Sequence, residues 1–599
     1  MVPVPSYALG LMRFRVNSRR RVVRLASASA LAFALVILVA APASAHALLL
    51  TSSPAAETSM SIPPKQIELT FSENVEISLG SIALVNEKGD RVDIGAPHHS
   101  ATSDHSIEAS VPRLDNGAYV VTWRVISADS HPVHGAFTFT IGRSSANVQG
   151  LATRLEAQSN GNKTVGVLFA IARAVEYAGI ALLIGAAVFS AAIRPHGRRR
   201  SRADALVWVG WLLLFVFTVA GLLLQGPYAG ALPLSEITHV SVVRAVLQTR
   251  FGHFAEVRLV LLLAALPLLF VVRKSWRPRW WWWALAVPIG LAIAATPGLA
   301  GHAATGDFVN VAVPIDTLHV VAMSVWLGGL AALALIVIDR DPDARRSADN
   351  FSPVALSSVL VIIATGTFAA WRQVGWSVDA FRHTSYGRIL LVKIAVFIVL
   401  LALAAWSRRI VRARRPISLS AAAVTESTST AARATQPADP EVRGLRWSVG
   451  GELVFGIAVL VITAMLVNAQ PARSALSGPY STEFREPTMV IDLLISPAKA
   501  GPVDFHVYTL SPAGGNVFTP SVTAEMSLPS KGIAPLTVPL VRAGPNHFIA
   551  CNGPPTVVGS TATCTHKFSI PLSGKWLIVI RALRNEFDEV PVQKIVNIR

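Results

Sequence analysis

Long apolar runs alternate with short polar segments through the middle of the 599-residue chain. Each of eight runs is close to the roughly 20 residues that a helix needs to cross the hydrocarbon core of a bilayer. The runs lie at about 165–192, 205–224, 256–272, 281–297, 312–338, 355–371, 388–407 and 450–468. The pattern therefore predicts an eight-helix transmembrane bundle over residues 165–470.

On both sides of this bundle, shorter segments alternate apolar and polar residues, as strands do. Examples are "KQIELTFS" and "GAYVVTWRVIS" before the bundle and "TMVIDLLIS" and "GKWLIVIRAL" after it. We expect a small all-β barrel or sandwich at 46–142 and a second β-sandwich at 475–599. Residues 143–164 are predicted to be a polar linker, and about 416–442, rich in Ala, Ser and Thr, a disordered cytoplasmic loop.

The N-terminal segment has the three parts of a secretory signal. A basic block that includes Arg19, Arg20 and Arg21 precedes an apolar stretch, which ends in Ala43-Ser44-Ala45. This order predicts a signal peptide at 1–45 that is cleaved before His46. The mature chain then begins outside the cytoplasmic membrane.

Composition and charge agree with a multi-pass membrane protein. The chain is 52% hydrophobic and only 15% charged, with a mean hydropathy of +0.50. The net charge of +18 comes from arginines and lysines in short loops rather than on one polar face, so no nucleic-acid partner is expected. The loops after the first, third, fifth and seventh helices carry them, which places these loops in the cytoplasm. Both β domains are then extracytoplasmic, on a chain held in the lipid bilayer of the plasma membrane.

The two cysteines, Cys551 and Cys564, exclude a disulfide-rich scaffold. In an oxidising compartment a disulfide between them is allowed, and the alternative is a pair of free structural thiols. The sequence has neither a P-loop nor the aspartate-centred phosphorylation loop of an ATP-driven pump. We therefore do not expect ATP-driven pumping by this chain alone, and we interpret the chain as a transport protein rather than an enzyme.

Metal-binding residue types occur at both ends of the first β domain. Asp129 and His131 are two residues apart after a strand-like run, so an extended backbone can project them to one side. Cleavage before His46 would add its imidazole and its free α-amine. Together these groups form a set of three nitrogens and one oxygen, which suits tetragonal Cu(II), whereas zinc prefers a tetrahedral arrangement. His134 is an additional candidate ligand.

Ionisable residues inside membrane spans are functional candidates because they are costly to bury in lipid. Asp316 and His319 are three residues apart and share a helix face, and His302 precedes that helix. We expect a metal pathway from His302 to Asp316 and His319. For the other ionisable residues in the spans, we expect structural roles. Arg173 and Glu176 would form a local ion pair, and Arg258 would extend to the membrane–water interface.

The first β domain resembles the periplasmic copper-binding family CopC in "HALLLTSSPAAETSMSIPPKQIELTFSENVE" and "DNGAYVVTWRVISADSHPVHGAFTFTIG". The resemblance implies a Greek-key β-barrel with a Cu(II) site formed by His46, Asp129 and His131.

The membrane region is similar to the CopD family of copper-resistance proteins. The segment "GHAATGDFVNVAVPIDTLHVVAMSVWLGGLAAL" carries its GHA loop, its D-x-x-H helix and its W-x-G-G end. "SPAKAGPVDFHVYTLSPAGG" resembles the extracytoplasmic tail of CopC and CopD fusions of the YcnJ type. His506, His547 and His566 are scattered through this tail and are predicted to be structural.

These patterns predict a protein that captures Cu(II) outside the membrane and passes it to the bundle for copper uptake or resistance, with Cu(I) as a candidate form in the membrane part. Other extracytoplasmic copper chaperones are candidate partners. Two alternatives stay open. One is a membrane oxidoreductase in which His302 and His319 hold haem or copper, and the other is a copper scavenger or sensor without transport.

Overall fold

The computed structural model describes residues 47–598, apart from 413–439 and a set of shorter gaps. These gaps are 55–57, 61, 102, 143–147, 160, 195–201, 275–278, 307, 340, 342, 376–377, 477–479, 513–516, 545, 554–555, 559–560, 565 and 586. The predicted signal peptide, His46 and most of the predicted loop at 416–442 lie outside the described residues.

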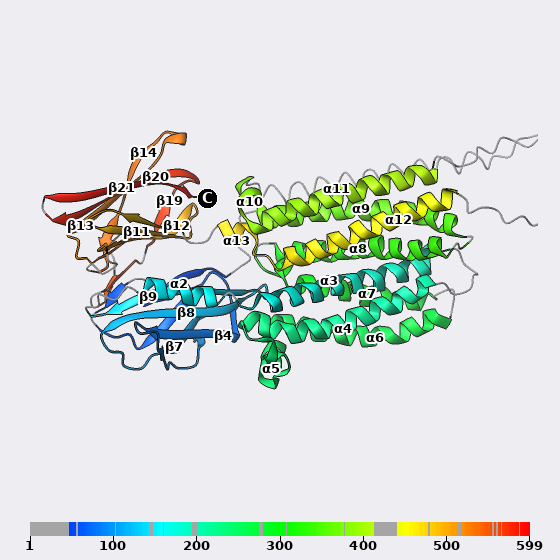
Figure 1. The fold of residues 1–599 in the computed structure, drawn as a ribbon, viewed down its shortest axis with the longest axis horizontal. Coiled ribbons are helices and arrows are strands. Elements are labelled where there is room, and N and C mark those ends of the chain that lie inside the picture. Colours follow the sequence, from blue (N-terminus) through cyan, green and yellow to red (C-terminus); the bar gives the residue numbers. More distant parts are fainter. Residues whose placement is uncertain are drawn as a thin grey trace, which may run out of the picture.

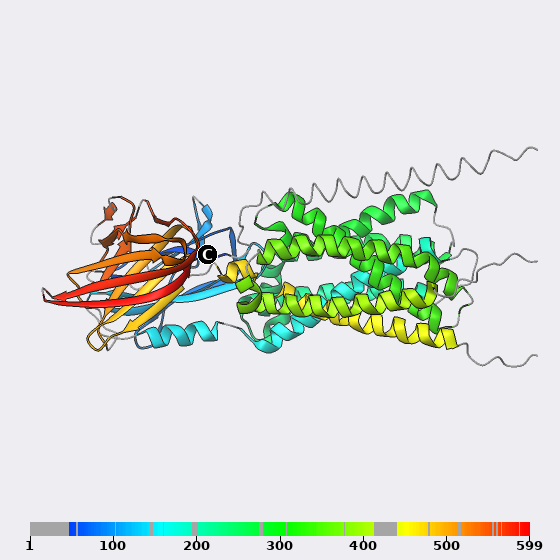
Figure 2. The same ribbon diagram turned by 90° about the horizontal axis from the view of Figure 1, so that it is seen from above.

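Two β domains lie beside each other at one end of a long helical bundle (Figure 1), and a view turned by 90° shows the same arrangement (Figure 2). An even number of membrane crossings requires this arrangement, because it returns the chain to the side on which it entered. The predicted order of a β domain, eight apolar helices and a second β domain is confirmed.

The first domain is a sandwich of two sheets with strand orders β1-β3-β7-β6 and β2-β9-β8-β4-β5. Phe71, Trp123 and Phe139 are buried between the sheets. Neighbours such as β3 and β7 are far apart in sequence, so the chain crosses between the sheets. The strands are β1 (Leu49–Ser53), β2 (Thr58–Met60), β3 (Gln66–Phe71), β4 (Val75–Asn86), β5 (Arg91–Val92), β6 (His98–Ser100), β7 (Ser103–Ser110), β8 (Gly117–Ser127) and β9 (Pro132–Ile141).

The segment predicted to be a linker contains a helix, α2 (Gln149–Gln158), that packs on this domain. Val148 and Ala152 are buried against Val85 and Val120 on the outer face of the five-stranded sheet. Four-residue spacing places both on one side of the helix. The expectation of a purely polar linker at 143–164 is thus corrected, because a short apolar stripe was enough to dock a helix.

Eight helices of the described chain are long and apolar enough to span a membrane. The central one is α8, whose most apolar window is 72% buried inside the protein, against at most 44% for the others. The eight are α3 (Lys163–Val188), α4 (Arg202–Gly230), α6 (Arg250–Lys274), α7 (Trp280–Leu299), α8 (Val309–Ile338), α9 (Ala344–Val374), α11 (Ser385–Arg412) and α12 (Pro440–Val467). Shorter helices are η1 (Phe189–Ile193), η2 (Leu234–Thr238), α5 (Val240–Leu247), η3 (His302–Ala304), α10 (Val378–His383) and α13 (Ala472–Leu476).

Helices α3 and α8 cross in backbone contact. A Cβ atom at Gly328 would overlap the carbonyl oxygen of Ala181, and one at Gly185 would overlap that of Ser324. Small residues permit such close approach between membrane helices. Gly328, in the W-x-G-G motif, therefore has a packing role, and Trp326 beside it is buried.

Buried charges in the bundle pair between helices rather than along one helix. Glu176 on α3 forms an ion pair with Arg258 on α6, and Thr218 on α4 donates to the same carboxylate at 3.3 Å. Arg258 is only 4% exposed. Arg173 instead donates to Asn468 Oδ1 at 2.8 Å. The expected Arg173–Glu176 pair and the interfacial Arg258 are both wrong, because a helix distant in sequence supplies a better buried partner.

The C-terminal domain is a second sandwich, with sheets ordered β10-β11-β12-β16-β15 and β14-β13-β20-β21. Trp576 is fully buried in its core, and Cys551 and Cys564 form a disulfide, as predicted. Its strands are β10 (Tyr480–Arg485), β11 (Val490–Ser496), β12 (Gly501–Leu510), β13 (Ser521–Leu528), β14 (Ile533–Val538), β15 (Leu540–Arg542), β16 (His547–Ala550), β17 (Thr556–Val558), β18 (Thr561–Thr563), β19 (Phe568–Ile570), β20 (Gly574–Asn585) and β21 (Asp588–Ile598), with η4 (Pro529–Lys531) after β13.

Candidate metal centre

The turn between β8 and β9 presents the Asp-x-His pair. Ser130 N donates to Ser127 O at 2.8 Å, and Ser127 N donates to His131 O at 2.9 Å. Ser130 has φ 70°, a left-handed conformation that a serine adopts only when its surroundings hold it there. Its hydroxyl donates to Ala300 O of the membrane bundle at 2.8 Å, which anchors the turn.

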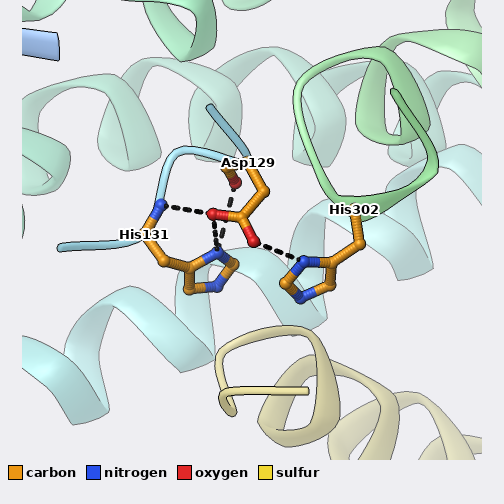
Figure 3. A group of neighbouring side chains, drawn as sticks. All are labelled: Asp129, His131 and His302. Carbon is orange, nitrogen blue, oxygen red and sulfur yellow. Dashed lines mark hydrogen bonds and ion pairs between the residues drawn. The ribbon is translucent and has the colours of Figure 1, made fainter. Parts of the chain in front are cut away.

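Asp129 lies at the centre of a cluster formed with two histidines (Figure 3). Its Oδ1 accepts from His131 N at 3.2 Å and lies 3.3 Å from His131 Nδ1. Its Oδ2 lies 2.8 Å from His302 Nδ1. The carboxylate side chain is fully buried. A buried carboxylate needs such partners or a cation, because an isolated charge away from water is very costly.

His302 reaches this cluster from the bundle, 173 residues further along the chain. It lies in η3 between α7 and α8, where Arg372 Nη1 donates to its carbonyl oxygen at 2.7 Å. The rings of His131 and His302 are nearly parallel, with centroids 4.7 Å apart. The GHA loop of the membrane region and the Asp-x-His turn of the first β domain thus form one site.

Both ring nitrogens of His131 face acceptors. Nε2 lies 2.7 Å from Val467 O at the end of α12, and Nδ1 lies 3.1 Å from the carbonyl oxygen of Asp129, beside the Asp129 carboxylate. The contact with Val467 fixes the orientation of the ring, with Nδ1 on the side of Asp129. One ligand atom from each of Asp129, His131 and His302 lies within 4.8 Å of the others. Two imidazole nitrogens and a carboxylate oxygen suit Cu(II) or Zn(II).

The predicted ligand His46 lies outside the described residues, but its neighbour is placed. Ala47 is fully buried, and its peptide nitrogen donates to Ser127 Oγ at 3.1 Å. Ala47 is therefore held beside Ser127, which is two residues before Asp129 in the sequence. The other candidate, His134, lies on β9 opposite Arg124 and is not part of the three-residue cluster.

Asp316 and His319 lie on α8, apart from this cluster. A Cβ atom at Gly298 would overlap the Asp316 carboxylate, so Asp316 packs against the last turn of α7, four residues before His302. His319 Nδ1 lies 2.8 Å from Thr365 Oγ1, whose own proton is donated to Val361 O. Thr365 must then accept from Nδ1, which leaves the His319 lone pair on Nε2.

The sequence did not predict the contacts between the first domain and the membrane bundle. The guanidinium of Arg124 on β8 donates to Tyr228 O at 3.1 Å and also to the carbonyl oxygens of Ala229 and Ser159. Burial lowers the pKa of Arg124 to about 10. Glu76 Oε1 accepts from Arg250 N at the start of α6 at 2.8 Å, and burial raises the pKa of this carboxyl group. The sequence signal for this docking contact was the presence of a charged residue, Arg124, inside the apolar run "GAYVVTWRVIS".

We expect the Arg124→Met variant to loosen this docking. Methionine keeps the aliphatic length but donates no hydrogen bond, and the three carbonyl contacts should cost about 2–4 kcal/mol when lost. Faster hydrogen exchange in residues 127–132 would report the change. The exposed Arg113→Met is the matched control, and equal exchange in both variants would contradict a docking role for Arg124.

Three family models match successive parts of the chain. The CopC domain matches residues 49–142, the copper resistance protein D-like N-terminal domain matches 164–309, and copper resistance protein D matches 345–466. Asp129 and His131 lie within the first match and His302 within the second. Asp316 and His319 lie between the second and the third.

Similar proteins include one that matches over nearly the whole chain. The chain is 26% identical over 573 residues to the copper transport protein CutJ of Bacillus subtilis (strain 168), covering 92% of this chain and 95% of that protein. It is 36% identical over 114 residues to copper resistance protein C of Escherichia coli, covering 18% of this chain and 90% of that protein. For copper resistance protein C of Pseudomonas syringae pv. tomato, the identity is 34% over 115 residues, covering 18% and 90%.

Proposed function

The chain belongs to the family of fused CopC and CopD copper-resistance proteins, and from this premise we propose that it binds Cu(II) outside the cytoplasmic membrane and moves copper into or across the bilayer. Copper is the substrate in this proposal. The similarity to a copper transport protein over 92% of the chain supports transport as the activity.

The observation that carries the proposal is the shared Asp129 carboxylate. One oxygen lies against His131 of the first domain, and the other lies 2.8 Å from His302 of the bundle. The sequence alone suggested a hop from one site to a separate one. On the proposed route, transfer would need only an exchange of ligands within one cluster, since residues of both domains contact the same carboxylate.

Beyond His302, the bundle offers a next pair of ligands. Asp316 packs against the helix turn before the His302 loop, and His319 presents its lone pair on Nε2. Both are on α8, the most buried helix. We propose that copper passes from the shared cluster to Asp316 and His319 along this helix.

The orientation in the membrane is part of the proposal. The predicted signal peptide and the arginine-rich loops support an orientation in which the end that carries both β domains lies outside the cytoplasm. Copper would then enter at the end where His302 meets Asp129.

The His302→Gln variant tests transport. We expect radiocopper uptake into cells to fall to the level of cells without the protein, because glutamine keeps the polarity but replaces the imidazole ligand. The exposed His253→Gln at the same end of the bundle should take up copper like the wild type. Equal uptake by His302→Gln, wild type and cells lacking the protein would rule out transport.

The oxidoreductase alternative would use the other nitrogen of each ring. The contacts of His302 and His319 with Asp129 and Thr365 are made by Nδ1, so a haem iron would have to bind at Nε2 of both residues. The relatives reported above are named for copper transport and copper resistance. A Soret band in the absorption spectrum of the purified protein would favour this alternative over transport.

A further inference from the structure

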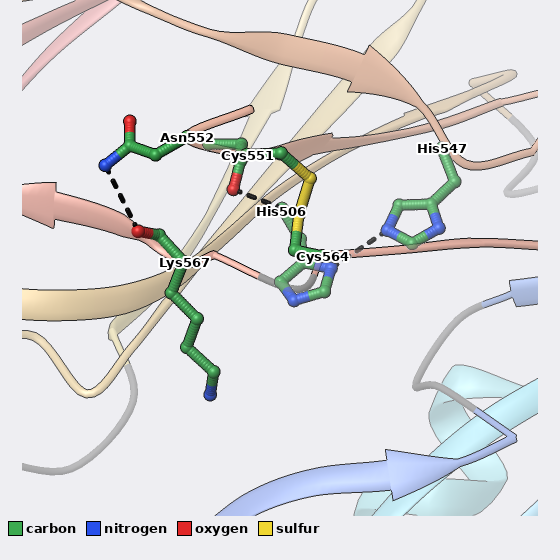
Figure 4. The surroundings of a disulfide bond; sticks show 7 residues. His506, His547, Cys551, Asn552, Cys564 and Lys567 are labelled. Carbon is green, nitrogen blue, oxygen red and sulfur yellow. Dashed lines mark hydrogen bonds between the residues drawn. A yellow bond between two sulfur atoms is a disulfide. The ribbon is translucent and has the colours of Figure 1, made fainter. Parts of the chain in front are cut away.

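His506 and His547 in the C-terminal domain meet head to head, although their spacing in sequence suggested separate structural residues. His506 Nδ1 lies 2.9 Å from His547 Nε2 (Figure 4). The ring planes differ by only 9°, and the centroids are 5.2 Å apart. That separation equals the distance between the nitrogens plus the two ring radii. The two nitrogens therefore point at each other along the line between the ring centres.

The strand register produces this arrangement. β12 and β16 pair antiparallel with Tyr508 opposite His547, and His506 lies two residues before Tyr508. All three side chains are thus on one face of the sheet. The alternate residues Phe505 and Val507 face the core of the sandwich. The Tyr508 ring lies 4.4 Å from that of His547, and its hydroxyl lies 3.4 Å from His506 Nδ1.

The pair is chemically poised to bind an ion. His547 is 2% exposed, and its Nδ1 has no hydrogen-bond partner among the residues that the structure describes. Burial lowers the pKa of His506 to about 4 and that of His547 well below its ordinary range. Both rings are then neutral at neutral pH, with lone pairs that protons do not occupy. The unpartnered Nδ1 of His547 is on the side of the ring away from His506, so an ion between the rings would bind the two nitrogens that face each other.

We propose that His506 Nδ1 and His547 Nε2 bind one Cu(I) ion between them, with the Tyr508 hydroxyl beside it. Two opposed imidazole nitrogens satisfy a d10 monovalent ion, whereas Cu(II) takes a tetragonal set and zinc takes four ligands. With metal–nitrogen bonds of about 2 Å, the nitrogens must separate to about 4 Å. His547 is the first residue of β16, so this small movement leaves the strand pairing intact.

One proton lies in the hydrogen bond between His506 Nδ1 and His547 Nε2. When Cu(I) binds, this proton moves to the other nitrogen of the same ring. Both rings stay neutral, and Cu(I) binding releases no proton. The nearby cysteines are joined to each other, and Cys564 Sγ contacts Ala550 O at the end of β16 at 3.4 Å. In this oxidised form no thiolate competes, and imidazole is the available ligand. The site goes beyond the proposed function, since it lies in another domain and takes another oxidation state of copper.

The test uses the full-length protein, purified in detergent with its disulfide intact. Cu(I) is supplied without oxygen as its acetonitrile complex, because thiol reductants would cut the disulfide. After competition with a chromophoric Cu(I) chelator, we measure the number of Cu(I) ions bound per chain. We expect His547→Gln to retain one Cu(I) ion fewer than the wild type. The exposed His566→Gln should match the wild type. Equal copper retention by wild type and His547→Gln would overturn the proposal.

Hydrogen exchange of the wild-type protein decides the question if the variant fails to fold. Ag(I), a d10 ion that needs no reductant, should slow exchange in peptides from β12 and β16 and leave those from β20 and β21 unchanged. Unchanged exchange in β12 and β16 would also overturn the proposal. Neither readout involves Asp129 or His302, so this result and the fate of the transport proposal can be told apart.

Discussion

The Asp129→Asn variant is expected to lose Cu(II) binding and copper uptake together. The carboxylate bridges His131 and His302, so one substitution removes the charged ligand from both halves of the site. Losing even an outer partner of a metal ligand costs about 10–100-fold in affinity, and we expect the loss of a ligand to reach the upper end of that range or exceed it. Cu(II) titration of the purified protein against a competing chelator measures the change.

Asp104→Asn is the matched control, because Asp104 is exposed on β7 of the same domain. It should bind and transport copper like the wild type. Asparagine has nearly the shape of aspartate, so the packing around position 129 should survive the change. If Asp129→Asn bound Cu(II) with wild-type affinity, the three-residue cluster would not be the metal site.

The Gly328→Val variant is expected to disrupt the membrane bundle. A side chain at this position would overlap the carbonyl oxygen of Ala181, which is backbone and cannot rotate away. The α3 and α8 helices must then separate, at a cost of about 3 kcal/mol or more. A lower melting temperature in detergent and a broader size-exclusion profile would report this loss.

Gly290→Val on α7 is the matched control. It adds the same side chain to a membrane helix at a position without a close helix contact. No atom lies within 4 Å of a Cβ placed at Gly290, so this variant should melt like the wild type. Equal melting temperatures for the two variants would mean that the α3–α8 contact does not limit stability. Gly328 is thus expected to permit the close α3–α8 crossing rather than to support a metal ligand.

Joining the capture site to the bundle has a physical consequence for transport. Arg124, Glu76 and Ser130 all bind groups of the membrane region, so the first domain is docked rather than tethered. On the proposed transport route, a docked domain would present copper to His302 without a search in solution, which removes the entropic cost of bringing two partners together.

Local patterns in the sequence were sufficient for the architecture. An apolar run of membrane length must form its hydrogen bonds within itself, so the eight helices follow from hydropathy alone. Alternating residues likewise marked the strands of both β domains, and the Asp129-x-His131 spacing placed two candidate ligands on one turn. The helix at Gln149–Gln158 was missed because its short apolar stripe becomes visible only once the sheet face that it covers is known.

What the sequence by itself determined was therefore the set of elements and the residue types able to bind copper. The tertiary structure decided which of these residues meet. It paired Glu176 with Arg258 rather than Arg173, brought His506 to His547, and placed His302 on Asp129. Periodicity reports on neighbours within a helix or strand, whereas these partners are separated by 41 to 173 residues. Only the packing of whole helices and sheets brings such distant positions together.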